Sequence, residues 1–306
     1  MKVLSNSSLG SLKYQKISCS CLRKSRMVTS LDDVKSLRFW RANVAEFLGS
    51  ALLVLMGCGS CSQWSKETTP SVIEVSFGFG FTIVTLVWIF GQTSGAHFNP
   101  SVTLALMITR KISFVRAVFY LIFQSVGGIT GAALLLSVLP KNKTVDLCPT
   151  VLAEDVGVFQ GMLVESFLAF FLVMTVYATS DTRRTDHKGP FPLTIGIVIT
   201  ACILMGAKFT GASINPVRSL GPAVVGGVWE HHWIYWLGPI FGGILGGILY
   251  DNLFAVNASL MKARACFMTS DYNGERFDPQ RVKIRIMEEE SIFRAPLAEP
   301  EELYMS

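Results

Sequence analysis

The side chains whose type and spacing most clearly suggest a function lie in two copies of one short sequence motif. In the first copy, Ser-Gly-Ala-His-Phe leads into Asn99-Pro100. In the second, Thr-Gly-Ala-Ser-Ile leads into Asn215-Pro216. Asn is a common helix N-cap and Pro suits the first helical position, so each pair predicts the start of a helix. Each pair also precedes a short apolar run, which predicts two half-helices whose positive ends meet inside a membrane, as a pore requires.

Each half of the chain also has one glutamate early in an apolar stretch, Glu46 and Glu165. A carboxylate inside a membrane is costly and indicates a role. Proton relay or cation coupling is one interpretation. The other is that each carboxylate accepts hydrogen bonds from the non-helical loop before a half-helix, because such backbone needs partners at membrane depth. The symmetry of the pair favours this second, loop-supporting interpretation.

The elements that must position these residues are membrane spans. Of the 306 residues, 50% are hydrophobic and only 16% are charged, whereas a soluble domain of this length needs more surface charge. Six runs approach or exceed the roughly 20 residues that cross a bilayer, and two further runs are half as long. The predicted spans are 42–61, 71–91, 114–139, 158–179, 190–208 and 232–254, and the predicted half-helices are 100–109 and 216–226.

Three spans in each half is an odd number, so the second half must sit upside down relative to the first. We therefore predict an all-α membrane protein with six transmembrane helices and two re-entrant half-helices in an inverted repeat. The membrane domain is expected at 40–255, with repeats at about 40–140 and 157–255. An arm, residues 1–39, and a tail, residues 256–306, flank it.

Lys and Arg are concentrated in the arm, after the first half-helix, between spans four and five, and in the tail. The positive-inside rule then places both termini in the cytoplasm of a multi-pass protein, and we expect the plasma membrane. The net charge of +5 reflects this asymmetry and gives no reason to expect nucleic acid as a partner. Membrane lipid is the expected environment.

Other reactive residue types have plainer interpretations. The seven cysteines lack a zinc-type spacing, so no metal or cofactor is expected. Cys58 and Cys61 form a C-x-x-C and are interpreted as small packing residues, with a redox pair as the alternative. Asn142 begins a glycosylation sequon in a predicted external loop. His97 is a candidate for the mouth of the pathway, with a hydrogen-bonded structural histidine as the alternative. The sequence has no nucleophile–base set and no phosphate loop, so an enzyme is not predicted.

With these motifs in view, residues 40–255 resemble the aquaporin (major intrinsic protein) family. The resemblance implies a right-handed helical bundle, one pore per subunit and a homotetramer. It further implies that Asn99 and Asn215 offer their amides to a permeating molecule, while the half-helix dipoles repel cations and interrupt the water file along which protons hop. The segments that carry the resemblance are the two Asn-Pro phrases, Ala45 to Phe47, Gly211 to Arg218, and His232 to Pro239.

The family's outer filter is carried over onto four residues of this sequence. Arg218 matches the filter arginine, Phe79 the aromatic of span two, and Ala212 the loop position. The position in span five falls on Ile203, or on Cys202 if the register slips by one. Strict water channels resemble one another in having a histidine there, and span five of this chain has none.

An apolar wall opposite Arg218 favours a passive channel for water and small neutral solutes such as glycerol or urea. This combination resembles the insect branch that includes glycerol-conducting members. Ser219 directly after the filter arginine fits the water-channel pattern instead, so a strict water channel stays an alternative. A coupled transporter, with Glu46 or Glu165 in its ion pathway, and a membrane scaffold are the remaining hypotheses.

Overall fold

The computed structural model of the protein has only helices as regular secondary structure over the residues that it describes. It describes residues 31–62, 69–140, 147–186, 189, 191–269, 272–277 and 287. The sequon at Asn142 lies outside them, as do most of the arm and the end of the tail. No strand occurs within the described ranges, and the predicted fold class is confirmed.

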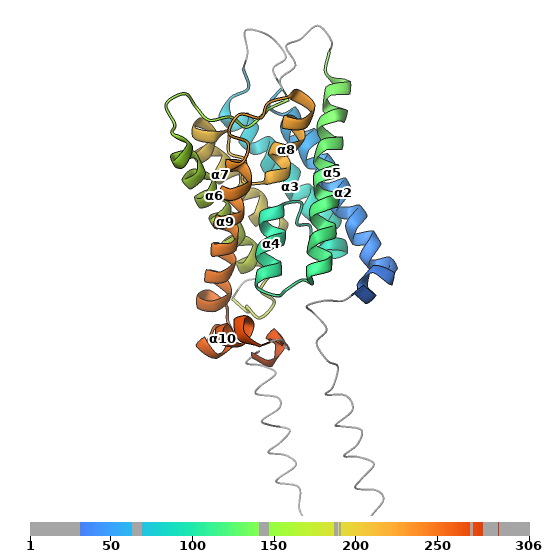
Figure 1. Ribbon diagram of the computed structural model, residues 1–306, viewed down its shortest axis with the longest axis vertical. Helices are drawn as coiled ribbons and strands as arrows, with labels where there is room; N and C mark the ends of the chain where they lie inside the picture. Colours follow the sequence, from blue (N-terminus) through green and yellow to red (C-terminus); the bar gives the residue numbers. More distant parts are fainter. Residues whose placement is uncertain are drawn as a thin grey trace, which may run out of the picture.

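Six helices are long and apolar enough to cross a membrane, and they stand side by side in Figure 1. Their bounds agree with the predicted spans to within a few residues. The first begins earlier than predicted because the Ser36 hydroxyl accepts a hydrogen bond from the Phe39 amide and so caps the helix. The helices are α2 (Leu37–Gly59), α3 (Val72–Ser94), α5 (Phe114–Val138), α6 (Val158–Ser180), α7 (Phe191–Thr210) and α9 (Ile234–Leu249), the last continued by the π-helical turn η2 (Tyr250–Phe254).

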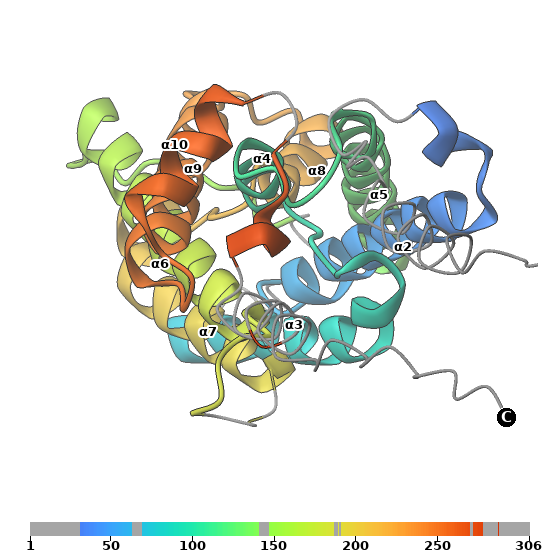
Figure 2. The same cartoon turned by 90° about the horizontal axis from the view of Figure 1, so that it is seen from below.

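Two short helices, α4 (Pro100–Ile108) and α8 (Pro216–Gly226), lie among the long ones (Figure 2). Each begins at the proline that follows a capping asparagine. Each packs mainly on the opposite half of the chain: α4 on α9, and α8 on α5. Within the halves, α2 packs on α5 and α6 packs on α9 in the same way. The inverted repeat is therefore interlocked.

Glycines bring the equivalent helix pairs close together. Gly131 of α5 faces the backbone carbonyl of Ala51 in α2, and Gly242 of α9 faces that of Ser166 in α6. A Cβ at either glycine would overlap the facing carbonyl oxygen. Gly127 and Gly131, and likewise Gly242 and Gly246, have the G-x-x-x-G spacing that lets membrane helices approach closely.

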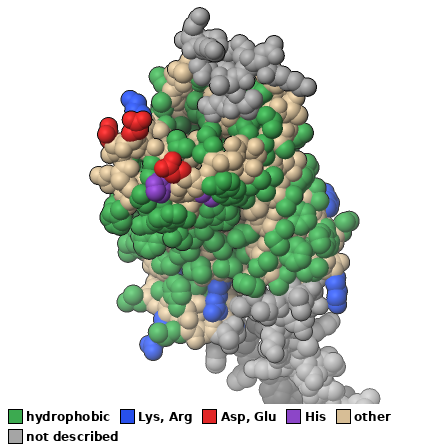
Figure 3. All heavy atoms as spheres, turned by 45° about the horizontal axis from the view of Figure 1, so that its top comes forward, with side chains coloured by type: hydrophobic (Ala, Val, Ile, Leu, Met, Phe, Trp, Pro, Cys, Tyr) green, Lys and Arg blue, Asp and Glu red, His purple; other side chains and the backbone are tan. Residues whose placement is uncertain are grey.

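Hydrophobic side chains cover the middle of the face seen in Figure 3, and most of the charged side chains in this view lie toward the two ends of the bundle. Trp88 and Phe241 belong to the large apolar side chains that are mostly exposed. Such an area would be unfavourable in water and fits contact with lipid.

The described part of the tail packs onto one end of the bundle. The short helix α10 (Leu260–Met268) lies at the same end as the 3-10 turn η1 (Leu31–Lys35) that precedes α2, and is followed by a second such turn, η3 (Gly274–Phe277) (Figure 1). Lys262 of α10 is buried and its Nζ lies 3.0 Å from Oδ2 of Asp251. Lys111, directly after α4, reaches Oδ1 of the same carboxylate at 2.9 Å. Two cations therefore share one buried anion beneath the bundle.

Candidate pore and selectivity filter

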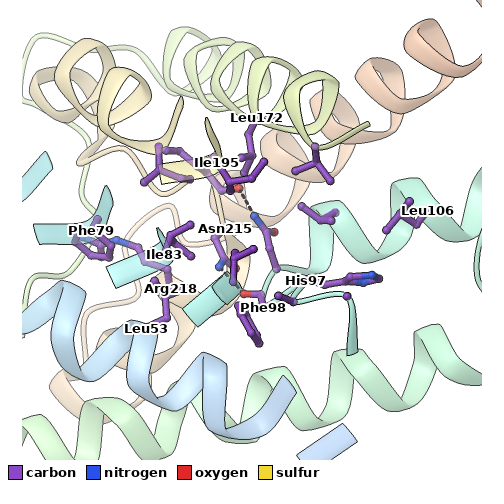
Figure 4. Close-up of a pocket in the computed structure, with 18 of the residues that line it drawn as sticks. Leu53, Phe79, Ile83, His97, Phe98, Leu106, Leu172, Ile195, Asn215 and Arg218 are labelled. Atoms are coloured by element: carbon purple, nitrogen blue, oxygen red, sulfur yellow. Dashed lines mark hydrogen bonds between the residues drawn. The ribbon is translucent and has the colours of Figure 1, made fainter. Parts of the chain in front are cut away.

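The two capping asparagines meet where the half-helices begin. Oδ1 of Asn99 accepts a hydrogen bond from the Ser101 amide at 2.8 Å, and Oδ1 of Asn215 accepts one from Val217 at 3.0 Å. Each cap thereby satisfies a donor that the first helical turn leaves unpaired. Both side chains line the same cavity, in which Asn215 is labelled in Figure 4.

The amide nitrogens of these asparagines cross to the opposite half. Nδ2 of Asn99 donates to the Ile214 carbonyl at 3.1 Å, and Nδ2 of Asn215 donates to the Phe98 carbonyl at 2.7 Å (Figure 4). An amide nitrogen carries two N–H groups. One donor on each side chain is used in the cross-connection, which leaves the other for a molecule in the cavity.

The loops before the half-helices have a backbone conformation that side chains disfavour. Ala96 and Phe98 in the first loop have φ values of 52° and 47°, and Ala212 and Ile214 in the second have 48° and 60°. Positive φ at residues other than glycine persists only where the surroundings enforce it. The two loops therefore need strong local support.

Glu46 of α2 lies against the first loop. Its carboxylate accepts hydrogen bonds from the amides of His97 at 3.0 Å and Phe98 at 2.7 Å, and from Nε2 of Gln124 at 2.8 Å. The side chain is fully buried and is absent from the described cavity lining.

Glu165 of α6 has the same arrangement at the second loop. It accepts hydrogen bonds from the amides of Ser213 at 2.8 Å and Ile214 at 2.7 Å, and from the Thr210 hydroxyl at 2.6 Å. It too is buried and outside the described cavity lining. These contacts are the ones that a loop-supporting carboxylate should make.

The cavity has a volume of about 320 Å³ and is lined mainly by apolar side chains. It extends from Phe79 and Arg218, past the two asparagines and His97, to Lys111 beside α10. It therefore connects the region of the predicted filter with the opposite end of the bundle.

The four predicted filter residues, Phe79, Ile203, Ala212 and Arg218, all line this cavity. The guanidinium carbon of Arg218 lies 5.0 Å from the centre of the Phe79 ring. Cys202 instead points at α6, where its Sγ donates to the Leu168 carbonyl at 3.6 Å. Of the two registers that the sequence left open, the structure therefore has Ile203 in the lining.

His97 lines the cavity on the other side of the asparagines (Figure 4). Its Nδ1 lies 3.1 Å from the Thr103 hydroxyl, and its ring packs edge-to-face with the Tyr120 ring, with 5.1 Å between the ring centres. Both interpretations of this residue, a lining group and a hydrogen-bonded structural one, agree with these contacts.

A disulfide beside the filter was not predicted. Cys61, at the end of α2, is bonded to Cys148 in the segment before α6, so its interpretation as a small packing residue is wrong. Cys58 is buried within α2, as a packing residue would be. The available signal was that Cys61, at the end of the first predicted span, and Cys148, in the loop between spans three and four, both fall on the predicted outer side, where oxidising compartments favour disulfides.

Comparison with known proteins decides the family. Residues 33–250 match the sequence model of the family described as "Major intrinsic protein". The chain belongs to the major intrinsic protein family. This aquaporin family comprises passive channels, so the chain is a membrane channel for water and not an enzyme.

Aquaporin relatives match most of the chain. Aquaporin-4 of Mus musculus is 41% identical over 253 residues, which cover 82% of this chain and 78% of the relative. Aquaporin-2 of Rattus norvegicus is 41% identical over 232 residues, which cover 76% and 85% respectively. The aquaglyceroporin structure from Plasmodium falciparum has a TM-score of 0.62 at 18% identity, covering 70% of this chain and 96% of that one, and so supports the aquaporin fold alone.

Proposed function

We propose that this aquaporin conducts water, excludes protons, and also admits small neutral solutes such as glycerol or urea. The observation that carries the solute range is the composition of the filter. Ile203, Phe79 and Ala212 form an apolar wall in the cavity that contains the guanidinium of Arg218. Apolar contact combined with a few fixed donors is how small neutral ligands are generally held.

Proton exclusion is supported by the helix ends and side-chain amides at the centre of the cavity. The N-termini of α4 and α8 converge there, and a helix N-terminus carries about half a positive charge. The amides of Asn99 and Asn215 donate to a passing water, so its oxygen must turn toward them. A water held in this way cannot pass a proton along the file.

Passive conduction is favoured over coupled transport by the environment of the two glutamates. Glu46 and Glu165 are fully buried and engaged by loop amides. A coupling site would have to face the pathway and change its protonation there. The hydrogen bonds of these carboxylates support a structural function instead.

A strict water channel is the second candidate. Ile203 is branched, and the Arg218 guanidinium lies over the Phe79 ring at 5.0 Å, which limits the width available to a solute. Ser219 donates to Ser213 at 2.6 Å and accepts from Thr150 at 2.7 Å, so a small polar network backs the arginine. These contacts fit a narrow filter.

Stopped-flow light scattering on purified protein in liposomes separates the two candidates, under a sucrose gradient first and a glycerol gradient second. Glycerol entry well above that of empty liposomes supports the wider range. Ile203→His should then reduce glycerol entry about tenfold, or roughly 1.4 kcal/mol of barrier, while water flux persists. Ile203→Val, which keeps the apolar wall, is the matched control. Fast water flux with glycerol at the empty-liposome rate would leave the strict water channel.

We further propose a homotetramer in the plasma membrane with both termini in the cytoplasm. Support for the orientation comes from the cations at the α10 end, which include Lys111, Arg116 and Lys262. Protease protection of tags placed at each terminus tests the orientation. Mass measurement of the detergent-solubilised protein tests the tetramer.

A further inference from the structure

The filter arginine depends on one loop residue for its position. Arg218 is buried, with 4% of its surface exposed, and makes no ion pair with a carboxylate in the described part of the chain. Its guanidinium donates to the carbonyl oxygen of Cys148 at 2.6 Å and to Sγ of the same residue at 3.1 Å. A buried charge requires hydrogen-bond partners. Where Cys148 lies therefore decides where the guanidinium lies.

Cys148 itself has a conformation that must be enforced. It belongs to a non-helical segment and has a φ of 59°, which residues with a side chain seldom adopt. Its disulfide to Cys61 brings the two Cα atoms to 5.6 Å and fixes the segment over the end of α2. A second attachment lies two residues further on, where the Thr150 hydroxyl donates to Ser219 at 2.7 Å.

The end of α2 supports the aromatic side of the filter as well. Gly57 lies against the Phe79 ring so closely that a Cβ there would overlap it. Cys61 follows one turn later, with its amide donating to the Cys58 carbonyl at 3.1 Å. The same helix end thus supports Phe79 by direct contact and Arg218 through the disulfide and Cys148.

We propose that the Cys61–Cys148 disulfide is a positioning element that sets the width of the filter between Phe79 and Arg218, and thereby its solute selectivity. Its consequence for glycerol rests on the proposed function. Without the bridge, the Thr150 attachment keeps the segment near the filter, but the acceptors of the arginine gain freedom to move. The filter then loosens while the bundle stays folded.

The chemistry of breaking the bridge is simple. Tris(2-carboxyethyl)phosphine supplies two electrons to the S–S bond, and one water supplies two protons to the thiols and its oxygen to the phosphine oxide. The bridge lies at the end of the bundle opposite α10, which is the outer side if the termini are cytoplasmic. Disulfides persist on that side of a membrane, so the bridged form is the resident state there.

The first measurement is the ratio of glycerol to water permeability in liposomes, for the wild type, Cys61→Ser, Cys148→Ser and the double variant. Cys58→Ser, on the same helix but outside the bridge, is the matched control. We expect the three bridge variants to raise the ratio by a similar factor of about three to ten. Reductant should bring the wild type to the same ratio and leave Cys61→Ser unchanged. If the wild type passes glycerol, equal ratios in the wild type and Cys61→Ser would overturn the proposal.

A second measurement does not depend on any solute. Methylglyoxal modifies guanidinium groups, and peptide mass spectrometry reports how fast Arg218 reacts in the bridged and the reduced wild-type protein. Arg264, which is exposed on α10, serves as the internal reference. We expect Arg218 to react several times faster once the bridge is open, with Arg264 unchanged. An unchanged rate at Arg218 would contradict the positioning function.

The two readouts separate this inference from the proposed solute range. If the wild type passes no glycerol but opening the bridge speeds the modification of Arg218, the solute range fails and the positioning function stands. If glycerol passes equally with and without the bridge and Arg218 reacts at one rate, the positioning function fails alone.

Discussion

Nδ2 of Asn215 donates to the carbonyl oxygen of Phe98 at 2.7 Å, so the cap of the second half-helix is bonded to the loop that precedes the first. The reciprocal bond runs from Asn99 to Ile214 at 3.1 Å. The two halves are thus joined at the point where a permeating molecule passes. The residues that face this molecule also hold the halves in register.

Asn215→Asp tests this double function. The carboxylate keeps an acceptor for the Val217 amide but loses the donor to Phe98, which leaves a buried carbonyl unpaired at a cost of about 1–3 kcal/mol. It also places an anion where helix dipoles repel cations. We expect a lower unfolding temperature and a measurable proton or cation leak, detected with a pH-sensitive dye in liposomes. Gln92→Glu, at an exposed position in α3, should change neither quantity.

Glu165→Gln should lower the stability of the protein. It should not change how transport responds to a proton gradient. The amide keeps one acceptor oxygen, but its NH₂ group faces a backbone N–H of the loop at Ser213 or Ile214. An unsatisfied buried donor costs about 1–3 kcal/mol. Thermal unfolding in detergent checks the loss, and Glu46→Gln should match it by symmetry. Loss of a pH-driven flux in a stable variant would instead revive the coupling hypothesis.

Lys262→Met should release α10 from the bundle. In the native protein Lys262 donates to the Asp251 carbonyl at 2.7 Å and to Oδ1 of Asn257 at 3.0 Å, besides its ion pair with Asp251. Lys111 still pairs the Asp251 carboxylate in this variant, but the buried acceptors of Lys262 lose their donor at a cost of about 1–3 kcal/mol. Limited proteolysis should cut the variant near α10 first, with the membrane helices intact. Arg264→Met, on the exposed side of α10, should be cut at the wild-type rate.

His232, which lies at the end of the bundle opposite α10, should make the stability of the protein depend on pH. Burial lowers the pKa of this imidazole below its ordinary value of 6.5, and its Nε2 accepts a hydrogen bond from Trp236 Nε1 at 3.1 Å. The unfolded chain therefore binds the proton more readily than the folded one. The contribution of neutral His232 to the free energy of unfolding is complete above pH 6.5. It is lost as the pH falls from there toward the lower pKa of the folded state.

The comparison is the unfolding temperature between pH 5 and 8 for the wild type and His232→Gln. The amide oxygen of Gln is an acceptor that does not titrate, so the variant should have a flatter profile. Parallel profiles would show that another group is responsible.

The sequence predicts local contacts where a physical requirement repeats. The helix caps at Asn99 and Asn215 and the loop contacts of Glu46 and Glu165 are predictable because each half of an inverted repeat needs the same cap and the same loop support. The spans were found because a bilayer fixes their length and polarity. The bounds of α2 differed because Ser36, a polar cap, lies outside the apolar run.

The features that could not be predicted from the sequence depend on the path of non-helical backbone and on tertiary contacts. The approach of Cys148 to Cys61 is set by a loop whose path leaves no periodic signal. Ile203 and Cys202 are neighbours, and only the rotation of α7 decides which of them enters the cavity. The docking of α10 depends on the buried Lys262, and nothing in the sequence around this lysine indicates that its Nζ meets Asp251.

The exchange of half-helices between the two repeats constrains the order of assembly. The surface of α9 that covers α4 is synthesised after almost everything else in the membrane domain. Until the second half arrives, the loop of the first half has the carboxylate of Glu46, but Asn99 lacks the carbonyl of Ile214 as its acceptor. The cover that α9 gives to α4 comes later still. The first repeat therefore cannot complete its packing alone. The wall of the pore is complete only when the final span enters the membrane.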